Sequence, residues 1–282
     1  MSLELLGAVL LALLVLGCLG LLAFRHLRAR RIRRAARGLR YPVVLAHGLM
    51  GFDELTLGER RHEYFKGVPA RLRQLGSDVY VVRVPPTGSV AQRAEALAQA
   101  VRSLDAKRVN IIAHSMGGLD ARYAISQLGL ASRVASLTTI GTPHHGTPLA
   151  DVGTRLLGDT LGLKRLCEAL TVGTDAFYDL TTEKMAEFNR RVPDARGVLY
   201  ASCVGAFRQR TRALNPFLLP TYLYLSRCVG PNDGVVPADS QKWGEVFGIY
   251  EADHWAQIGW SSRFDTESFY ASLFQALRER GL

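Results

Sequence analysis

The chain contains a serine, an aspartate and a histidine, far apart and in the order Ser115, Asp233, His254. Together these three residue types can activate a nucleophile. A serine hydroxyl is a weak nucleophile until a base removes its proton, and a third group must hold that base in place. Each of the three follows a segment that the sequence predicts as a strand, so their side chains can meet at one edge of a sheet. We therefore expect His254 to take the Ser115 proton while Asp233 orients the imidazole ring.

Other acids and bases of the chain fit this order less well. Asp233 lies in a turn bracketed by glycines, whereas Asp239 lies beyond it and Asp253 is too close to His254 in sequence to orient its ring. All the remaining histidines precede Asp233 in the chain. Two of them, His144 and His145, follow another predicted strand; they are expected to be hydrogen-bonded loop residues or, alternatively, to face the substrate.

The residues around Ser115 predict a strand, a sharp turn and a helix. The run 109–113 is β-branched and apolar, as in a buried parallel strand, and a helical pattern continues to Gln127. Ser115 stands between them in a small-X-Ser-X-Gly sequence, with Ala113 and Gly117 as the small residues. This is the pattern of the nucleophile elbow of α/β-hydrolases, with Ala in place of the usual first Gly.

The elements that must position these residues alternate between strand and helix patterns. Strands are expected at 41–46, 79–84, 109–113, 137–140, 198–204 and 245–250, and helices at 67–75, 89–104 and the C-terminus. This order predicts an α/β fold, mostly a parallel sheet with helices on both faces. The Gly-flanked loop after the first strand predicts that Leu49 supplies one backbone N–H of an oxyanion hole, and Met116 the other.

Two stretches between the later strands are less regular. Residues 149 to about 190 are helical but interrupted by glycines, and their apolar content predicts a lid over the sheet edge. Ordinary helices packed on the sheet are the alternative. The segment 207–225, rich in Phe, Leu, Pro and Tyr, is expected to be mobile.

The first 40 residues have a different composition from the rest. Leu5 to Phe24 is an uncharged run long enough to span a bilayer, and eight arginines follow within residues 25–40. We interpret 1–24 as a retained transmembrane anchor, 25–40 as an Arg-rich juxtamembrane segment and 41–282 as one catalytic domain. The arginines predict that this domain lies on the cytoplasmic side of the membrane; a lipoprotein signal ending at Cys18 is the alternative.

The charge and cysteine content of the chain exclude some classes of function. The formal net charge of +10 falls to about +3 when residues 1–40 are left out, so no nucleic-acid partner is expected. The arginines are instead expected to lie on anionic lipid headgroups or to form a solvated spacer. Four cysteines without Cys-X-X-Cys or Cys/His spacing indicate reduced thiols and no metal site.

Several motifs together resemble the bacterial triacylglycerol lipases of the Pseudomonas/Burkholderia/Proteus group. The matching segments are 47–53 (HGLMGFD), 113–118 (AHSMGG), 141–151 (GTPHHGTPLAD), 232–234 (NDG) and 253–254 (DH). The resemblance implies hydrolysis of acylglycerol esters under a helical lid. It also implies Ser115, Asp233 and His254 as nucleophile, acid and base, with Leu49 and Met116 as oxyanion donors.

The chain departs from this family in two respects. Many members bind a structural calcium ion through an Asp two residues after the catalytic His, where this chain has Ala256. One hard oxygen ligand is therefore missing, which argues against calcium, and no cofactor is expected. Family members are also usually secreted, whereas this chain carries a predicted anchor.

These observations predict a membrane-anchored serine esterase or lipase acting on lipid esters. A phospholipase, an acyltransferase or a thioesterase with the same three residues is an alternative within enzymes. A non-catalytic, membrane-tethered binding module is an alternative from another class. The oligomeric state is not indicated by the sequence.

Overall fold

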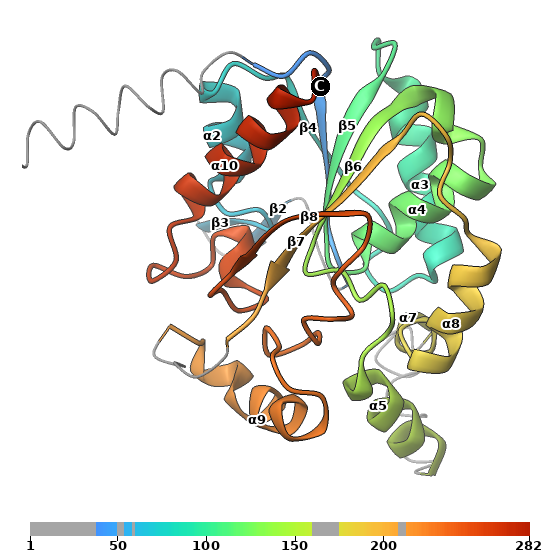
Figure 1. Ribbon diagram of the computed structural model, residues 1–282, viewed down its shortest axis with the longest axis vertical. Coiled ribbons are helices and arrows are strands. Elements are labelled where there is room, and N and C mark those ends of the chain that lie inside the picture. Colours follow the sequence, from blue (N-terminus) through green and yellow to red (C-terminus); the bar gives the residue numbers. More distant parts are fainter. Residues whose placement is uncertain (1–37, 50–53, 58–59, 160–174, 208–212) are drawn as a thin grey trace, which may run out of the picture.

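A six-stranded parallel sheet forms the centre of the computed structural model, which describes residues 38–49, 54–57, 60–159, 175–207 and 213–282 (Figure 1). The strand order is β4-β1-β5-β6-β7-β8, and every neighbouring pair is parallel. The strands are β1 Val43–Ala46, β4 Val79–Val82, β5 Val109–His114, β6 Val134–Ile140, β7 Leu199–Gly205 and β8 Glu245–Tyr250. The predicted α/β-hydrolase class of fold, with a mostly parallel sheet, is confirmed.

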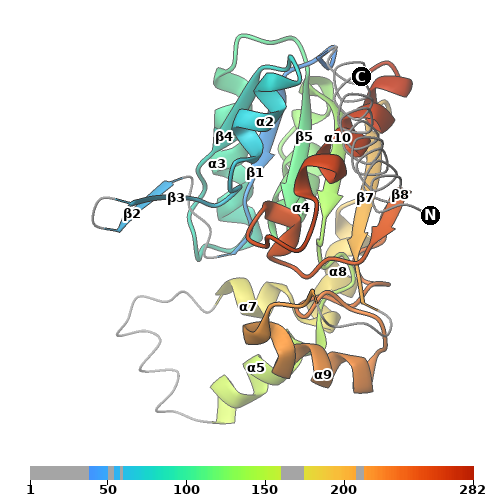
Figure 2. The same cartoon turned by 90° about the vertical axis from the view of Figure 1, so that its left-hand side faces the viewer.

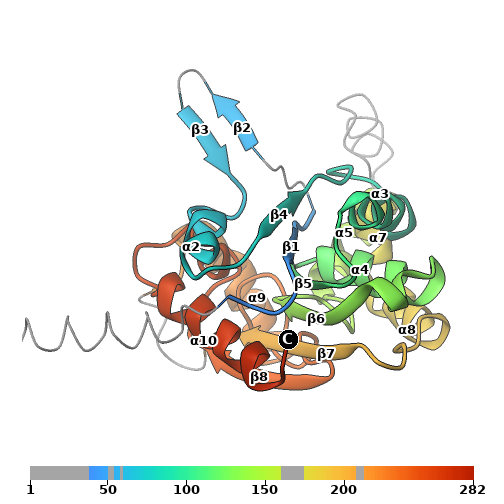
Figure 3. The same cartoon turned by 90° about the horizontal axis from the view of Figure 1, so that it is seen from above.

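Helices cover both faces of the sheet because alternate residues of each strand point to opposite sides. Val44 and Ile111 pack with α3 (Val90–Ser103) and α4 (Gly117–Gln127) in one cluster. Val43 and Ile112 pack with α2 (Val68–Gln74) and α10 (Thr266–Glu279) in another. Figure 3 shows the two helix pairs on either side of the strands. Both faces are therefore apolar, which explains the continuous hydrophobic strand patterns.

Four helices of the described part of the chain gather beyond the carboxyl ends of the strands (Figure 2). They are α5 Pro148–Asp159, α7 Asp175–Asp179, α8 Thr182–Arg191 and α9 Leu219–Cys228. The first three belong to the stretch predicted as a lid, of which residues 160–174 lie outside the described residues. That this stretch acts as a lid stays a prediction.

Two features of the structure differ from the sequence-based expectations. An antiparallel hairpin of β2 (Glu54–Leu57) and β3 (Arg60–Glu63) projects from the body of the molecule in Figures 2 and 3, and no strand was predicted there. The segment 207–225, for which no helix was predicted, contains most of one, and its mobility stays a prediction. A short 3₁₀ turn at Pro216–Leu218 leads directly into α9, since Pro220 in the first turn costs a helix no hydrogen bond. Two further 3₁₀ turns lie at Leu130–Arg133 and Ala256–Ile258.

Both ends of the described domain lie at the amino edge of the sheet. The Arg40 amide donates to the Leu282 carbonyl at 3.0 Å, and the chain then enters β1 at Val43. The predicted transmembrane segment 1–24 lies outside the described residues. Among the residues that are described, no helix combines the length and apolar character needed to cross a bilayer.

Candidate active site

Ser115 occupies a strained turn between β5 and α4. Its φ angle is 55°, and among the described residues no other non-glycine residue has a positive φ. Such a conformation costs on the order of 1–3 kcal/mol and persists only where the surroundings hold it. Here the Ser115 amide donates to the Ile140 carbonyl at 2.9 Å, and the Thr142 hydroxyl donates to the Ser115 carbonyl at 2.7 Å. The side chain, 8% exposed, stands at the carboxyl edge of the sheet.

The small residue at position 117 has a clear steric reason. A Cβ atom on Gly117 would lie 2.7 Å from the carbonyl oxygens of both Ala46 and His47. The start of α4 therefore packs directly on the end of β1. This contact brings the serine turn against the loop that was predicted to supply an oxyanion donor.

Asp233 and His254 are in direct contact. His254 Nδ1 donates to Asp233 Oδ2 at 2.8 Å, and the His254 amide donates to the Asp233 carbonyl at 2.9 Å. The other carboxylate oxygen, Oδ1, accepts from the amides of Val235 and Val236 at 2.9 and 2.7 Å. Asp233 is fully buried and His254 is 6% exposed, so this pair is shielded from solvent.

Gln257 completes the surroundings of Asp233, and no sequence motif predicts this role. Its Nε2 donates to Asp233 Oδ2 at 3.1 Å from a fully buried position. Asp253 lies beside this pair but serves another purpose. Its carboxylate accepts from the backbone amides of Asn215, Trp255 and Ala256 at 2.8–3.0 Å, which fixes the turn that carries His254.

Leu49 follows a glycine that lies against Ser115. A Cβ atom on Gly48 would lie 2.7 Å from Ser115 Cβ and 3.1 Å from its Oγ. Within the described part of the chain, the backbone hydrogen bonds include none from the amides of Leu49 or Met116. Two backbone N–H groups close to a buried hydroxyl are what an oxyanion hole requires.

A buried arginine, Arg93, stabilises the loop that contains His47, Gly48 and Leu49. Arg93 donates to the His47 carbonyl at 2.7 Å, to the Pro85 carbonyl at 2.8 Å and to the Asp120 carboxylate at 2.9 Å. Arg93 is 0% exposed, and Asp120 is 1% exposed. Burial raises the pKa of Asp120 and the Arg93 guanidinium opposes this effect. Arg93 could not be predicted from the sequence, because it belongs to no motif.

Ser115 and His254 line one cavity of about 490 Å³. Tyr64 and Thr147 also border it, but the remaining wall is apolar: Leu49, Leu149, Ala150, Phe177, Leu180, Val235, Trp255, Ile258 and Trp260. Leu149 and Ala150 belong to α5 and Phe177 to α7, so the predicted lid region contributes to the wall. The cavity is suited to an apolar group placed beside a nucleophile.

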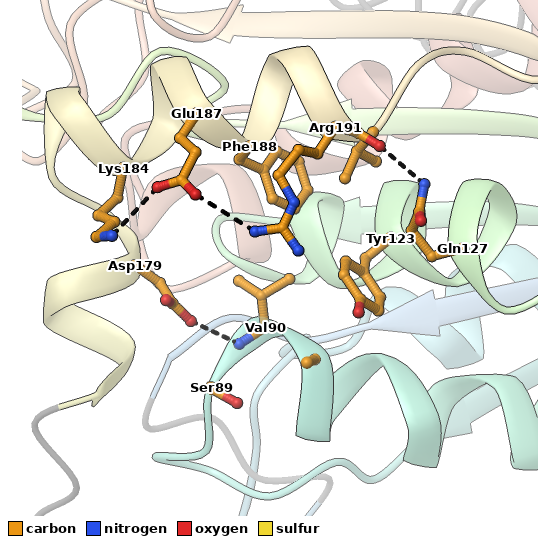
Figure 4. A pocket seen from close by; sticks show the side chains of 11 residues that line it. Ser89, Val90, Tyr123, Gln127, Asp179, Lys184, Glu187, Phe188 and Arg191 are labelled. Atoms are coloured by element: carbon orange, nitrogen blue, oxygen red, sulfur yellow. Dashed lines mark hydrogen bonds and ion pairs between the residues drawn. The ribbon is translucent and has the colours of Figure 1, made fainter.

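A second cavity of about 360 Å³ lies away from these residues, between α3, α4 and α8 (Figure 4). Its charged side chains are engaged with protein groups: Glu187 with Lys184 at 3.2 Å and with Arg191 at 3.4 Å, and Asp179 with the Val90 amide at 2.8 Å. It lacks a nucleophile with an adjacent base. We interpret it as the groove where α8 rests on the core helices.

The calcium site that the resemblance implies does not fit this structure. Ala256 offers no side-chain oxygen, and both carboxylate oxygens of Asp253 point at backbone amides, whose positive hydrogens oppose a cation. Among the described residues no cluster of three His, Cys, Asp or Glu side chains could hold a metal ion.

His144 has a structural environment. It is fully buried, accepts a hydrogen bond from Arg122 at 3.3 Å, lies 3.0 Å from the Thr139 hydroxyl and stacks on Trp243 at 5.3 Å. Burial, with the Arg122 charge, lowers the pKa of His144 well below its usual range. Neither His144 nor His145 borders the Ser115 cavity. The expectation of hydrogen-bonded loop histidines therefore describes His144 better than a role against substrate.

The chain is similar to known lipases. The family model for the alpha/beta hydrolase fold matches residues 41–157. A triacylglycerol lipase of Vibrio cholerae is 34% identical over 285 residues, which cover 86% of this chain and 89% of the relative. Triacylglycerol lipase 2 of Saccharomyces cerevisiae is 32% identical over 273 residues, or 80% and 82% of the two chains. A crystal structure of a mature Bacillus licheniformis lipase has a TM-score of 0.66 at 21% identity, covering 84% of this chain and 91% of that one.

Proposed function

The chain belongs to the triacylglycerol lipase family of α/β-hydrolases and is a carboxylic ester hydrolase; from this premise we propose that Ser115, His254 and Asp233 are its catalytic triad. The observation that carries the proposal is the shared cavity of Ser115 and His254, with Asp233 bonded to the far side of the imidazole at 2.8 Å. The strained turn at Ser115 supports the same assignment.

In the proposed reaction, the Ser115 hydroxyl attacks the ester carbonyl while His254 takes its proton. The serine oxygen forms a bond to the acyl carbon, and the carbonyl electron pair moves to oxygen. Collapse expels the alcohol, which receives the proton from His254. Water then attacks the acyl-enzyme by the same route. Asp233 holds the Nδ1–H of His254, so that the opposite ring nitrogen is free to act as base.

The amides of Leu49 and Met116 are the proposed donors to the oxyanion. Leu49 follows Gly48, which lies against Ser115, and Met116 lies between Ser115 and the first residue of α4, Gly117. Loss of one such donor typically lowers turnover by about 10²–10³-fold. Because these donors are backbone groups, loop position rather than side-chain identity decides their effect.

The proposed substrates are lipid esters of the acylglycerol type. The cavity beside Ser115 is lined mainly by apolar side chains, as the burial of an acyl chain requires. The names of the curated relatives point to the same substrate class. Phospholipase, acyltransferase and thioesterase activities use the same chemistry on a different leaving group or acceptor, and substrate profiling separates them.

The first experiment measures hydrolysis of p-nitrophenyl esters of increasing acyl length by the full chain and by the Ser115→Ala variant. We expect hydrolysis by the wild type and at least a 10³-fold loss in the variant, since the residual rate comes from binding and the oxyanion hole. Equal rates for a folded Ser115→Ala variant would refute the triad. Parallel assays with triacylglycerols, phospholipids and acyl thioesters identify the leaving group.

We also propose that residues 1–24 anchor the enzyme in a membrane, with the Arg-rich segment and the catalytic domain on the cytoplasmic side. The uncharged 20-residue run and the eight arginines after it support this orientation. Protease added to intact cells should leave the domain uncut, and protease added to inverted vesicles should digest it. The opposite pattern would reverse the orientation and leave the ester chemistry unaffected.

A further inference from the structure

Tyr64 lies beside the nucleophile without belonging to the proposed triad. Its ring borders the Ser115 cavity, and its hydroxyl accepts a hydrogen bond from the Gly48 amide at 3.1 Å. A Cβ atom built on Gly48 would lie 2.8 Å from this hydroxyl and 3.1 Å from Ser115 Oγ. The phenol therefore holds the residue that precedes Leu49, at the point where the loop passes the serine.

The same hydroxyl contacts His114, the residue before Ser115. The Tyr64 oxygen and His114 Nδ1 are 2.7 Å apart, and His114 Nε2 is 3.0 Å from the His254 carbonyl oxygen. A carbonyl can only accept, so Nε2 must carry the hydrogen. His114 is fully buried, and burial together with the nearby His254 holds its pKa well below the usual range. The ring is therefore neutral, its Nδ1 accepts, and the Tyr64 hydroxyl donates to it.

These contacts form one chain of hydrogen bonds. It runs from the loop with Gly48 and Leu49, called here the oxyanion loop, to the segment that carries the proposed base His254. Gly48 N–H donates to Tyr64, Tyr64 donates to His114, and His114 donates to the His254 carbonyl. The rings of His114 and His254 also pack at 4.5 Å between centroids. The two joined backbone segments come from opposite ends of the domain, before β2 and after β8.

We propose that Tyr64 and His114 are positioning residues for ester hydrolysis, which together set the spacing between the oxyanion loop at Gly48 and the His254 segment. The proposal rests on the proposed function, because it assumes that His254 is the base and Leu49 a donor. Tyr64 does not act as an acid toward substrate, since its proton is engaged by His114. Burial also raises the pKa of Tyr64 well above its usual range.

The first test is Tyr64→Phe, which keeps the aromatic ring and removes only the hydroxyl. A displaced oxyanion loop weakens an interaction made in the transition state, so kcat should fall about tenfold while KM changes less than twofold. Tyr80→Phe is the matched control, because this tyrosine lies 42% exposed on β4 and its variant should retain wild-type kcat. Thermal unfolding of each variant checks that the fold is kept.

Substitutions of His114 test whether the hydrogen bonds of Tyr64 and His114 affect kcat through one shared connection. His114→Leu breaks both contacts and should lower kcat at least as much as Tyr64→Phe. His114→Gln offers one acceptor and one donor, and should recover part of the loss. The double variant Tyr64→Phe/His114→Leu should be no slower than His114→Leu alone, since both changes break the same connection.

The outcomes separate this inference from the proposed function. A wild-type kcat in Tyr64→Phe, or additive losses in the double variant, would overturn the positioning role while Ser115→Ala remained inactive. A raised KM with unchanged kcat would also overturn it, because Tyr64 would then act in substrate binding. Hydrolysis that persists in Ser115→Ala would refute the proposed function and this inference with it.

Discussion

At the scale of single residues, the Asp233 carboxylate is the most completely engaged group of the proposed site. It accepts four hydrogen bonds, two from backbone amides, one from His254 and one from Gln257. Four N–H groups aimed at its two oxygens hold the carboxylate in one orientation. Its ability to orient the imidazole therefore depends on groups that never reach the substrate.

Replacing Gln257 with Leu should lower kcat by about tenfold and leave KM nearly unchanged, because a hydrogen bond to a charged group contributes about 1.5–3 kcal/mol. Stopped assays on a p-nitrophenyl ester measure the change. Gln275→Leu, on the exposed side of α10, is the control and should behave as the wild type. A Gln257→Leu enzyme with full kcat would show that the amide does not support Asp233.

Contacts of this kind explain which site residues the sequence could predict. Ser115, Asp233 and His254 were identifiable because residue type, chain order and neighbouring strand patterns agree, and the structure brings them to one edge of the sheet. Tyr64 and Gln257 lie in no motif, and their partners are distant in sequence. Only the folded backbone places the Tyr64 hydroxyl near Gly48 or the Gln257 amide near Asp233.

At the scale of elements, α3 connects the core to the helices over the carboxyl edge. Its first turn begins with a capping box, in which the Ser89 hydroxyl accepts from the Gln92 amide and the Gln92 side chain accepts from the Ser89 amide. The Val90 amide donates to the Asp179 carboxylate at the end of α7, as Figure 4 shows. A carboxylate at a helix N-terminus is also favoured by the helix dipole.

Replacing Asp179 with Ala should reduce the free energy of unfolding by about 1–2 kcal/mol, because one amide of the α3 terminus loses a charged acceptor. Urea titration followed by circular dichroism measures the difference. Asp239→Ala removes a carboxylate from an exposed ion pair with Lys242 and should cost less than about 0.5 kcal/mol. Equal costs for the two variants would contradict a specific contact at α3.

The elements themselves were predicted unevenly for physical reasons. The four inner strands β1, β5, β6 and β7 were located because both faces of the sheet are buried there, which gives uninterrupted apolar runs. The edge strands β4 and β8 are partly exposed, and a glycine interrupts the apolar residues of β8. The helix predicted over 89–104 corresponds to α3, which begins with the capping box. In the hairpin β2–β3 each strand has only four residues, and β3 (RRHE) has no apolar residue to mark it as a strand. The helix α9 begins with Leu-Pro and aromatic residues that resemble a loop.

At the scale of the whole molecule, two neutral histidines are buried in the fold. Burial is the largest cause that lowers the pKa of both His114 and His144, followed by His254 for the first and Arg122 for the second. The unfolded chain binds protons at these histidines near the ordinary pKa of 6.5, whereas the folded chain does not. Stability is therefore complete above this pH and decreases as the pH falls below it.

The free energy of unfolding should fall between pH 7.5 and 5.5 with a limiting slope of about 1.4 kcal/mol per pH unit for each histidine. Urea titrations across this range measure the slope. His144→Gln should make the free energy of unfolding less dependent on pH, because one group that binds a proton only in the unfolded chain is removed. His145→Gln should change it less, since that side chain is exposed. An unchanged profile in His144→Gln would mean that His144 is protonated in the folded state.

The pairing of the Arg40 amide with the Leu282 carbonyl has a practical consequence for handling the enzyme. Because both ends of the described domain emerge together on the side remote from the Ser115 cavity, a tag or a carrier protein fused at either end would leave the entrance to the cavity clear. If the enzyme were immobilised on a bead through one end, the entrance of the Ser115 cavity would point away from the bead. Emulsion droplets too large to diffuse between protein molecules could then still reach the serine.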